Sequence, residues 1–468
     1  MTFVRKFLGH NLILKPPARF GLSRRDRINA IVSQANKTTP FYKGKFDYFL
    51  STSHGLSDEE FYYAFSHLPI ATKQELRDNN AGFMCESLTG KTDLLQNGKT
   101  PSATEFLNHV LIKKDFFTAI STGGSSGAPT FRWLDHHDAN IFAQSFLHSF
   151  KLNGWKPGES FVVFYPLKSY FTGPFAAHET ALRRLFGFTM VPFEEISKER
   201  VLTLLDTLKK RKATLLVIFP CVLQRVAEIM AAEGIPPFEN LPCINVSGEF
   251  FLDCSKRFIQ KMFPDSDIQS TYGAVEFGEI AHQHGLSAQD CKVFGDYAYV
   301  EQGPENSMLV TALQQRAFPL IRYRIEDMGK VVTDINGDQT ITMLEGKNTD
   351  FIPGADGYAY YPSFFNALVN EINKAFGFPV IHFMLRHQTL RNKHYLQMNY
   401  VVNDPDKAAE IEQASLETLG KYFTNFHAID IRFWPYFEHD YTRKFKIIGE
   451  GDGLAEVVGG YHQRTAAL

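Results

Sequence analysis

Apolar and polar residues alternate in two rhythms along the middle of the chain. One helical face is predicted by apolar residues at three- and four-residue spacing: Val201, Leu204, Leu205 and Leu208. The apolar run 214–219 follows and stops at Pro220, as a buried strand does. A helical pattern at 221–232 and an apolar run at 243–246 repeat the pair. This βαβ rhythm predicts a parallel or mixed sheet covered by helices.

The two ends of the chain follow other patterns. Residues 22 to about 80 read as helical, with polar breaks at 38–40 and 51–57. Near residue 346 the character changes to a small α+β unit. Its expected elements are a helix at 364–376 and strands at 380–386, 395–401 and 429–434. A second helix is expected with Asp404 as its N-cap and Pro405 at its first position, and it continues on one face through Ala408, Ile411, Leu419 and Tyr422.

We therefore predict an α/β protein with two domains. A chain of 468 residues is too long for one ordinary core. Residues 1–345 are expected to form a large N-terminal domain of mixed or parallel sheets covered by helices. Residues 346–468 are expected to form a small, mobile C-terminal α+β domain.

Composition narrows the class of protein. Hydrophobic residues make up 44% and charged residues 21%, the balance of a soluble globular protein. The net charge of -2 argues against wrapping a long nucleic acid. No apolar run is long enough to span a bilayer, and the N-terminal stretch lacks a signal-peptide cleavage site. Five scattered cysteines without CxxC spacing suit a reducing cytoplasm, so we expect a cytoplasmic protein.

A glycine- and serine-rich loop at residues 122–129 is the first candidate for chemistry. It lies within FFTAISTGGSSGAPTFRWL, between two apolar segments. Glycines let backbone N–H groups surround an anion, and hydroxyls add donors, which suits a triphosphate. The loop is not a Walker A motif, because no lysine follows Gly127. Taken alone, it fits a flexible surface loop equally well.

Other segments give the loop its meaning. The chain also contains LPIATKQELR at 68–77, YFTGPFAAHETALRRLFG at 170–187, SGE at 247–249, TYGAVE at 271–276, PLIRYRIEDMG at 319–329, GKNTDFI at 346–352 and YTRKFKII at 441–448. In order and spacing, these segments resemble the adenylate-forming superfamily, and within it the phenylacetate–CoA ligase branch and its relatives from capsule biosynthesis. The similarity covers roughly residues 30 to 450.

The resemblance implies an ATP site. The phosphates would be held by Thr122, Gly123, Gly124, Ser125, Ser126 and Gly127. The adenine would lie between two further segments, formed by Tyr272, Gly273 and Ala274 and by Ser247, Gly248 and Glu249. Glu276 would hold Mg²⁺, and Asp327 would accept hydrogen bonds from the ribose hydroxyls. The structural alternatives are that Glu276 is a salt-bridged surface glutamate and that Asp327 caps a turn.

Lys444 aligns with the lysine that bridges the carboxylate and the α-phosphate during adenylation. An ammonium neutralises both anions as they approach. The neighbouring Lys446 remains an alternative from register alone. Lys444 and Glu276 are thus the predicted catalytic residues.

Several positions depart from the pattern of the family. Val275 replaces a Thr or Ser that touches phosphate, and Glu326 replaces a glycine. Lys347 takes the place of a ribose-contacting arginine, so a compact ammonium replaces a planar guanidinium that can donate two parallel hydrogen bonds. Thr349 stands at the hinge position, where Asp350 can serve instead. Arg443, not glycine, precedes Lys444.

An aromatic pocket is expected for the acid. Its predicted lining is Tyr165, Tyr170, Phe171, Phe175 and His178, and core packing is the even alternative for each. Gly173-Pro174 replaces the double glycine of phenylacetate ligases, so phenylacetate is not assumed. The spacing of His282, His284 and Cys291 is not a clean zinc pattern. Ordinary surface histidines and a buried thiol are favoured, and a structural zinc stays the open alternative.

The expected reaction is ATP-dependent formation of an acyl-adenylate with release of pyrophosphate. Acyl transfer to coenzyme A (CoA), or to another thiol or amine, would follow. ATP and Mg²⁺ are the expected cofactors, a carboxylic acid is the substrate, and a monomer or homodimer is expected. Two alternatives stay open: AMP transfer to a non-acyl hydroxyl, and a non-catalytic nucleotide-binding protein.

Overall fold

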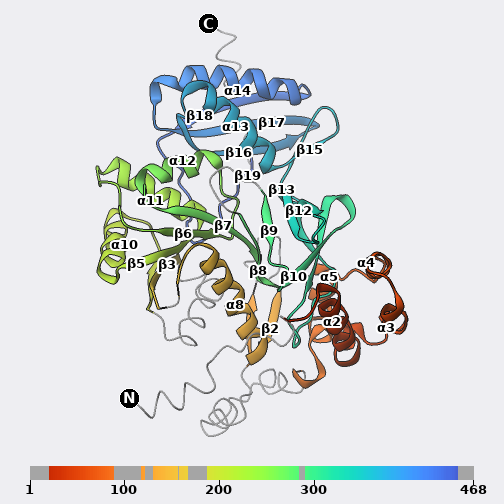
Figure 1. Cartoon of the computed structure of the whole chain (residues 1–468). Coiled ribbons are helices and arrows are strands. Elements are labelled where there is room, and N and C mark those ends of the chain that lie inside the picture. Colours follow the sequence, from red (N-terminus) through yellow and green to blue (C-terminus); the bar gives the residue numbers. More distant parts are fainter. Residues whose placement is uncertain are drawn as a thin grey trace, which may run out of the picture.

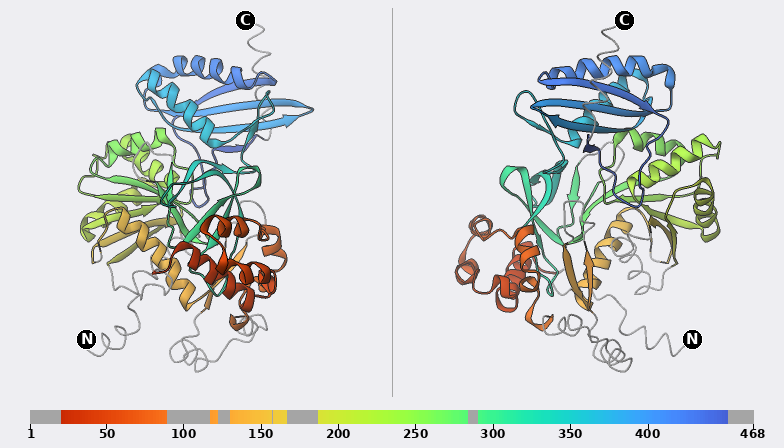
Figure 2. Two further views of the ribbon diagram at one scale, coloured as in Figure 1. Left: turned by 45° about the vertical axis from the view of Figure 1, so that its right-hand side comes forward. Right: turned by 180° about the vertical axis from the view of Figure 1, so that it is seen from behind.

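The computed structural model describes residues 21–88, 117–121, 130–156, 158–166, 187–283 and 290–451. A large sheet with helices on its faces occupies the centre of the molecule (Figure 1). Helices from the N-terminal part lie at one side of the sheet, and a smaller C-terminal sheet lies across one end. Both views in Figure 2 show the same three parts.

Within the described residues, eleven strands form the large sheet in the order β10-β11-β12-β13-β9-β8-β7-β6-β5-β3-β4. They are β3 (Ser160–Pro166), β4 (Phe188–Phe193), β5 (Ala213–Ile218), β6 (Cys243–Ser247), β7 (Asp267–Ala274), β8 (Gly278–Gln283), β9 (Cys291–Val293), β10 (Ala298–Gln302), β11 (Ser307–Ala312), β12 (Tyr323–Thr333) and β13 (Gln339–Lys347). In this order across the sheet, neighbouring strands between β7 and β4 are parallel, and neighbouring strands between β10 and β7 are antiparallel. The predicted mixed α/β fold is confirmed.

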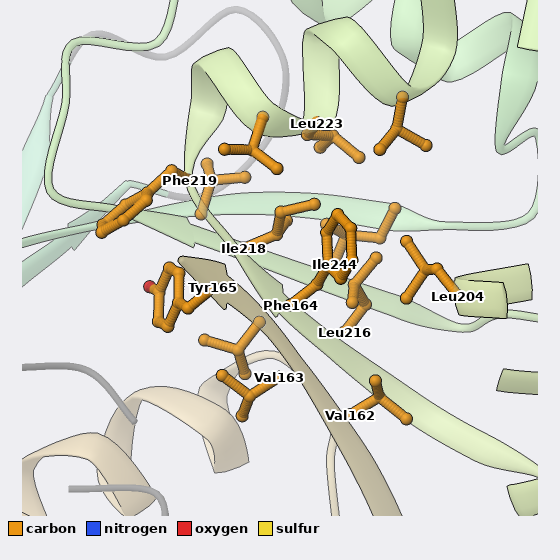
Figure 3. Packing of buried hydrophobic residues seen from close by; sticks show 14 of the residues in the cluster. Val162, Val163, Phe164, Tyr165, Leu204, Leu216, Ile218, Phe219, Leu223 and Ile244 are labelled. Atoms are coloured by element: carbon orange, nitrogen blue, oxygen red, sulfur yellow. The ribbon is translucent and has the colours of Figure 1, made fainter. Parts of the chain in front are cut away.

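Helices cover the parallel part of the sheet as the sequence pattern predicts. They are α8 (His136–Leu152), α10 (Lys198–Arg211), α11 (Pro220–Ala232) and α12 (Asp253–Met262). The buried side chains of α10 are the four predicted ones: Val201, Leu204, Leu205 and Leu208. They pack against β5 and its neighbours, where Leu216, Ile218 and Phe164 belong to the buried core (Figure 3).

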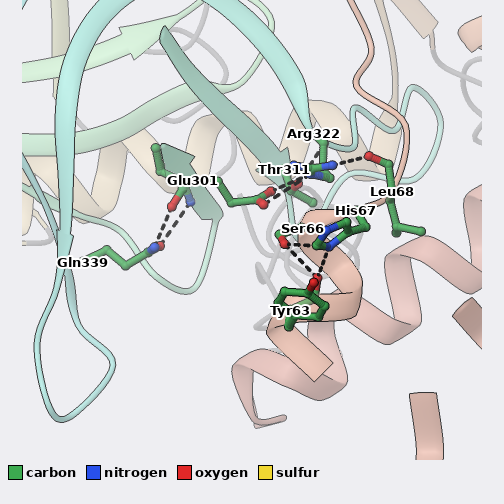
Figure 4. A network of polar contacts seen from close by, with 9 residues as sticks. Tyr63, Ser66, His67, Leu68, Glu301, Thr311, Arg322 and Gln339 are labelled. Atoms are coloured by element: carbon green, nitrogen blue, oxygen red, sulfur yellow. Dashed lines mark hydrogen bonds and ion pairs between the residues drawn. The ribbon is translucent and has the colours of Figure 1, made fainter. Parts of the chain in front are cut away.

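The helical part near the N-terminus docks on the antiparallel half of the sheet. It contains α2 (Arg24–Thr38), η1 (Pro40–Tyr42), α3 (Asp47–Thr52), η2 (Ser53–Gly55), α4 (Asp58–Ser66), α5 (Lys73–Asp78) and η3 (Asn80–Phe83). Arg322 is buried, donates to the Glu301 carboxylate at 3.1 and 3.2 Å, and also donates to the Leu68 carbonyl (Figure 4). Ala71 exchanges backbone hydrogen bonds with Arg322 and Arg324 at 3.1 and 2.8 Å. This pairing brings the start of α5 beside β12.

The C-terminal sheet has four strands in the described residues, in the order β18-β17-β16-β19. The elements of this part are β14 (Ile352–Pro353), β15 (Ala359–Tyr360), α13 (Pro362–Phe376), β16 (Val380–Leu390), β17 (Lys393–Val402), η7 (Pro405–Lys407), α14 (Ala408–Tyr422), β18 (Phe426–Trp434) and β19 (Ile448–Glu450). Asp404 caps the short turn η7, through a 3.2 Å bond from the Asp406 N–H, and not α14 itself. The domain boundary at 345/346 stays a prediction.

The C-terminal sheet packs against helix α12 of the large-sheet part through polar and apolar groups. Asn366 of α13 exchanges two hydrogen bonds of 2.9 Å with Asp253 of α12. Ser255 donates to the Ile381 carbonyl at 3.1 Å. Phe445 packs against both the large core and the C-terminal core. No helix in the described ranges is long and apolar enough to cross a bilayer.

Candidate functional site

Segments that are far apart in the sequence meet at one edge of the large sheet. Ser247 ends β6, and Gly248 and Glu249 follow it. Residues 272–276 lie at the end of the neighbouring strand β7, and Ser247 pairs with Thr271. Asp327 lies in β12. Lys444 lies on the segment between β18 and β19. These predicted residues, which come from both parts of the molecule, are brought together.

Asp327 is held by two neighbours from different strands. Tyr272 Oη donates to Asp327 Oδ2 at 2.8 Å, and Lys347 is directly opposite Asp327 in the β12–β13 ladder. Burial raises the pKa of the Asp327 carboxyl, while the Tyr272 hydrogen bond and the charges of Lys347 and Lys444 lower it. A hydrogen-bonded carboxylate with one oxygen already positioned suits the recognition of neighbouring hydroxyls.

The charge of the Lys444 ammonium acts on three carboxylates of the large-sheet part. Part of the residue is exposed, yet the surrounding protein desolvates the ammonium and lowers its pKa. Glu249, Asp327 and Glu276 oppose that shift. A cation so placed can neutralise anions that enter the same space. The choice of Lys444 over Lys446 stays a prediction.

Gly248 leaves room beside Lys444. Its φ is +88°, and a Cβ added there would lie 3.0 Å from the Phe219 ring and 3.8 Å from Lys444 Cε. Ser247 is buried, and its Oγ lies 3.3 Å from the Tyr165 hydroxyl. Tyr165 and Phe219 lie side by side with ring centroids 4.2 Å apart (Figure 3). Tyr165 is therefore packed next to the SGE turn.

Glu249 has different neighbours from those that an adenine-flanking role suggests. Its carboxylate accepts hydrogen bonds from the backbone N–H groups of Cys221 and Phe445, at 3.0 and 2.7 Å. It is thus tied to the segment that carries Lys444. Its contact with adenine stays a prediction.

Glu276 is 8% exposed and follows the half-buried residues Tyr272, Gly273 and Ala274. Burial raises the pKa of its carboxyl, while a hydrogen bond from its own backbone and the charges of Lys73 and Arg132 lower it. Among the described residues, no three His, Cys, Asp or Glu side chains form a metal-binding group. Glu276 therefore fits Mg²⁺ only where phosphates and water supply most ligands, which is how proteins commonly bind that ion.

The charge of Arg132 acts on Glu276, and the sequence patterns did not indicate this residue. It lies in β2 (Phe131–Asp135), which pairs with β1 (Phe117–Ser121). It is 1% exposed, and Nη1 donates to the Val275 carbonyl at 3.2 Å. Burial lowers the pKa of Arg132 to about 10, against the charges of Asp138 and Glu276. The available signal was an arginine at a buried position of an apolar strand directly after the glycine-rich loop.

Lys73 was also missed as an individual residue. Its Nζ lies 2.6 Å from Glu326 Oε2, and its charge acts on Glu276. Glu326, one of the departures, thus has a partner. At the predicted hinge, the Asn348 N–H donates to the Glu326 carbonyl at 2.9 Å, and Thr349 Oγ1 donates to Asp350 at 3.2 Å.

Some predicted residues lie outside the described residues. They are Thr122, Gly123, Gly124, Ser125, Ser126 and Gly127 of the loop, and Tyr170, Phe171, Phe175 and His178 of the pocket. His284 lies outside as well. In the described part, Lys256 is buried near Cys291 and donates to Gln283 at 3.2 Å.

Comparisons with known proteins agree with the resemblance read from the sequence. The phenylacetate-coenzyme A ligase of Aromatoleum evansii is 24% identical over 225 residues, which are 45% of this chain and 50% of that protein. The Pseudomonas putida enzyme of the same name is 22% identical over 258 residues, or 52% of this chain and 56% of its own. The matches thus span about half the length of these relatives. No protein-family model matches the chain.

Solved structures show the fold. A 2-hydroxyisobutyryl-CoA ligase in its postadenylation state, bound to 2-HIB-AMP, matches with a TM-score of 0.67 and 16% identity, over 98% of each chain. The same ligase with 2-HIB-AMP and CoA in its thioesterification state matches with a TM-score of 0.54 and 16% identity, over 97% of each chain. Both likenesses show the fold of the chain.

Proposed function

We propose that this chain, which has the fold of adenylate-forming CoA ligases and resembles phenylacetate-coenzyme A ligases in sequence, activates a carboxylic acid with ATP. The products of the first step are an acyl-adenylate and pyrophosphate, and the acyl group then passes to CoA or to another thiol or amine. The observation that carries the proposal is the position of Lys444 beside Asp327, Glu249 and Glu276. A lysine of the C-terminal part thus acts by its charge on carboxylates of the large-sheet part.

Each residue then has a chemical role. Asp327, steadied by Tyr272, accepts hydrogen bonds from the ribose hydroxyls. Lys444 neutralises the acid's carboxylate and the α-phosphate as the carboxylate oxygen attacks phosphorus and pyrophosphate leaves. Mg²⁺ held by Glu276 would withdraw charge from the phosphates. The loop at 122–129 would supply the remaining phosphate donors, and the aromatic segment at 170–178 would line the acid pocket.

Exchange of labelled pyrophosphate into ATP, measured with a panel of aryl and aliphatic acids, tests the first step. We expect exchange with at least one acid, and we expect Lys444→Ala to reduce it by roughly 100-fold or more. Lys446→Ala is the matched control and should keep most of the rate. If ATP binds but no acid supports exchange, the proposal is wrong.

Mass spectrometry of the products tests the second step. An acyl-CoA that forms only when CoA is present supports the ligase. AMP retained on a hydroxyl acceptor would instead support AMP transfer, and ATP binding without any product would support a non-catalytic protein. A cytoplasmic location belongs to the same proposal. A mobile domain at 346–468 belongs to it as well, because it would carry Lys444 away before the second step.

A further inference from the structure

Glu249 connects the segment that carries Lys444 to a helix of the large sheet. Its Oε1 accepts from the Phe445 N–H at 2.7 Å, and its Oε2 accepts from the Cys221 N–H at 3.0 Å. The Cys221 thiol also donates to Oε1 at 3.3 Å. One carboxylate therefore bridges residues 221 and 445, which belong to different parts of the fold.

The contact with Cys221 completes the start of α11. This helix begins at Pro220, and its N-cap residue Phe219 has no side-chain cap. The N–H groups of a first helical turn lack partners within the helix, so Glu249 supplies an acceptor from outside. The positive end of the helix dipole also favours the ionised carboxylate. Burial raises the pKa of Glu249, whereas the N–H groups of Cys221 and Phe445 and the charge of Lys444 lower it.

The contact with Phe445 fixes the residue next to Lys444. The Phe445 ring packs against both cores, so its backbone is held by the ring on one side and by Glu249 on the other. Gly248, directly before Glu249, leaves the space beside Lys444 Cε. The SGE turn thus both admits and orients the Lys444 side chain.

We propose that Glu249 is a positioning residue that holds Lys444 in place for adenylation and releases its segment for acyl transfer. This inference rests on the proposed function. When the C-terminal part turns away, Glu249 loses the Phe445 N–H but keeps Cys221 and the start of α11. The Glu249 carboxylate therefore keeps a hydrogen-bond partner throughout, so the release does not leave a buried charge unpaired.

The geometry requires a carboxylate, since both oxygens face N–H donors. A glutamine has one acceptor oxygen and one NH₂ donor. In Glu249→Gln, an NH₂ group would therefore face the N–H of either Cys221 or Phe445. Glu249→Ala would lose both contacts without placing two donors against each other.

Separate measurement of the two half-reactions tests the inference. Pyrophosphate exchange, with the acid that gives the highest wild-type rate, reports adenylation. Thioester formation from the chemically synthesised adenylate of that acid and CoA reports transfer. We expect Glu249→Gln to slow exchange roughly 100-fold, as a misplaced catalytic group does, and to leave the transfer rate near that of wild type. Glu249→Ala should likewise slow exchange and leave transfer near the wild-type rate. Lys444→Ala should abolish exchange almost completely and also leave transfer near the wild-type rate.

Asn366→Ala is the matched control for domain contact in general. It removes the two bonds between Asn366 and Asp253 without touching the Lys444 segment. We expect it to slow exchange far less than Glu249→Gln, and circular dichroism should show both variants folded. Equal slowing by Asn366→Ala, unchanged exchange in Glu249→Gln, or equal slowing of both half-reactions would each overturn the inference. No exchange by the wild-type protein would instead overturn the proposed function.

Discussion

Lys73 and Glu326 form an ion pair with 2.6 Å between Nζ and Oε2, and this pair joins the N-terminal helices to the strand that carries Asp327. The two side chains are 17% and 26% exposed, so water screens the pair only in part. The departure at position 326 therefore has a structural consequence. It fixes a cation from α5 near Glu276.

Lys73→Met should affect nucleotide use more than stability. Removal of the cation leaves Glu276 and Glu326 without its charge, so we expect KM for ATP to rise several-fold. The loss of unfolding free energy should be about 1 kcal/mol or less. Lys43→Met is the control, because its 3.0 Å pair with Glu86 is largely exposed. A steep fall in the denaturation midpoint with unchanged KM would contradict this prediction.

Tyr272→Phe should move the acid limb of the pH profile upward. The Tyr272 hydrogen bond lowers the pKa of Asp327, which burial raises. Without that bond the carboxylate takes up a proton at higher pH, so activity that needs ionised Asp327 is lost earlier as pH falls. We expect kcat/KM for ATP to fall roughly tenfold at neutral pH, the effect of about 1.4 kcal/mol.

The pH dependence of exchange measures this change. Tyr400→Phe is the control, since it removes a buried hydroxyl bonded to Ser415 at 2.9 Å in the C-terminal core. It should cost about 1 kcal/mol of stability and leave the acid limb in place. The same acid limb in Tyr272→Phe and wild type would show that Asp327 is not the group that titrates.

Arg132→Met should raise the Mg²⁺ concentration needed for activity. The guanidinium holds the Val275 carbonyl and places positive charge near Glu276, so its loss favours the protonated form of that carboxyl. Loss of one member of a buried charge cluster should also cost about 3–5 kcal/mol of stability. A Mg²⁺ titration of the exchange rate, beside denaturant unfolding, separates the two effects. Arg132→Lys keeps the charge and should restore part of the Mg²⁺ response.

Glu279 should make the protein less stable as pH rises. It is 4% exposed, and burial raises its pKa from 4.5 to about 8. The folded state then holds a proton that the unfolded state has lost, so stability falls as pH rises from about 4.5 to about 8. Glu279→Gln removes this titration, and we expect its melting temperature relative to wild type to be higher at pH 8.5 than at pH 5. An equal difference at both pH values would contradict it.

The elements whose apolar residues recur at a regular spacing were predictable from the sequence. The spacing of apolar residues predicts the buried face of α10 and the buried strand β5. Asp404 shows the limit of local signals, since its cap precedes a short turn and not the helix itself. Whether such a turn intervenes depends on how α14 packs, which a cap signal does not encode.

The candidate site was predictable only where motifs carry it. Asp327 and Lys444 came from the resemblance, and the structure brings them together. Arg132 and Lys73 were missed because their partners lie 143 and 253 positions away in the chain. A buried arginine in an apolar strand looks unfavourable until the carbonyl and carboxylates around it are known.

Phe445 has one more consequence, because its ring belongs to two cores at once. A shared side chain, together with the Asn366–Asp253 bonds, couples the melting of one core to that of the other. In this arrangement the two sheets should unfold in one calorimetric transition. Once the ring leaves the large core, each sheet should melt with its own enthalpy. The number of heat-absorption peaks would then report the arrangement of the chain without any substrate.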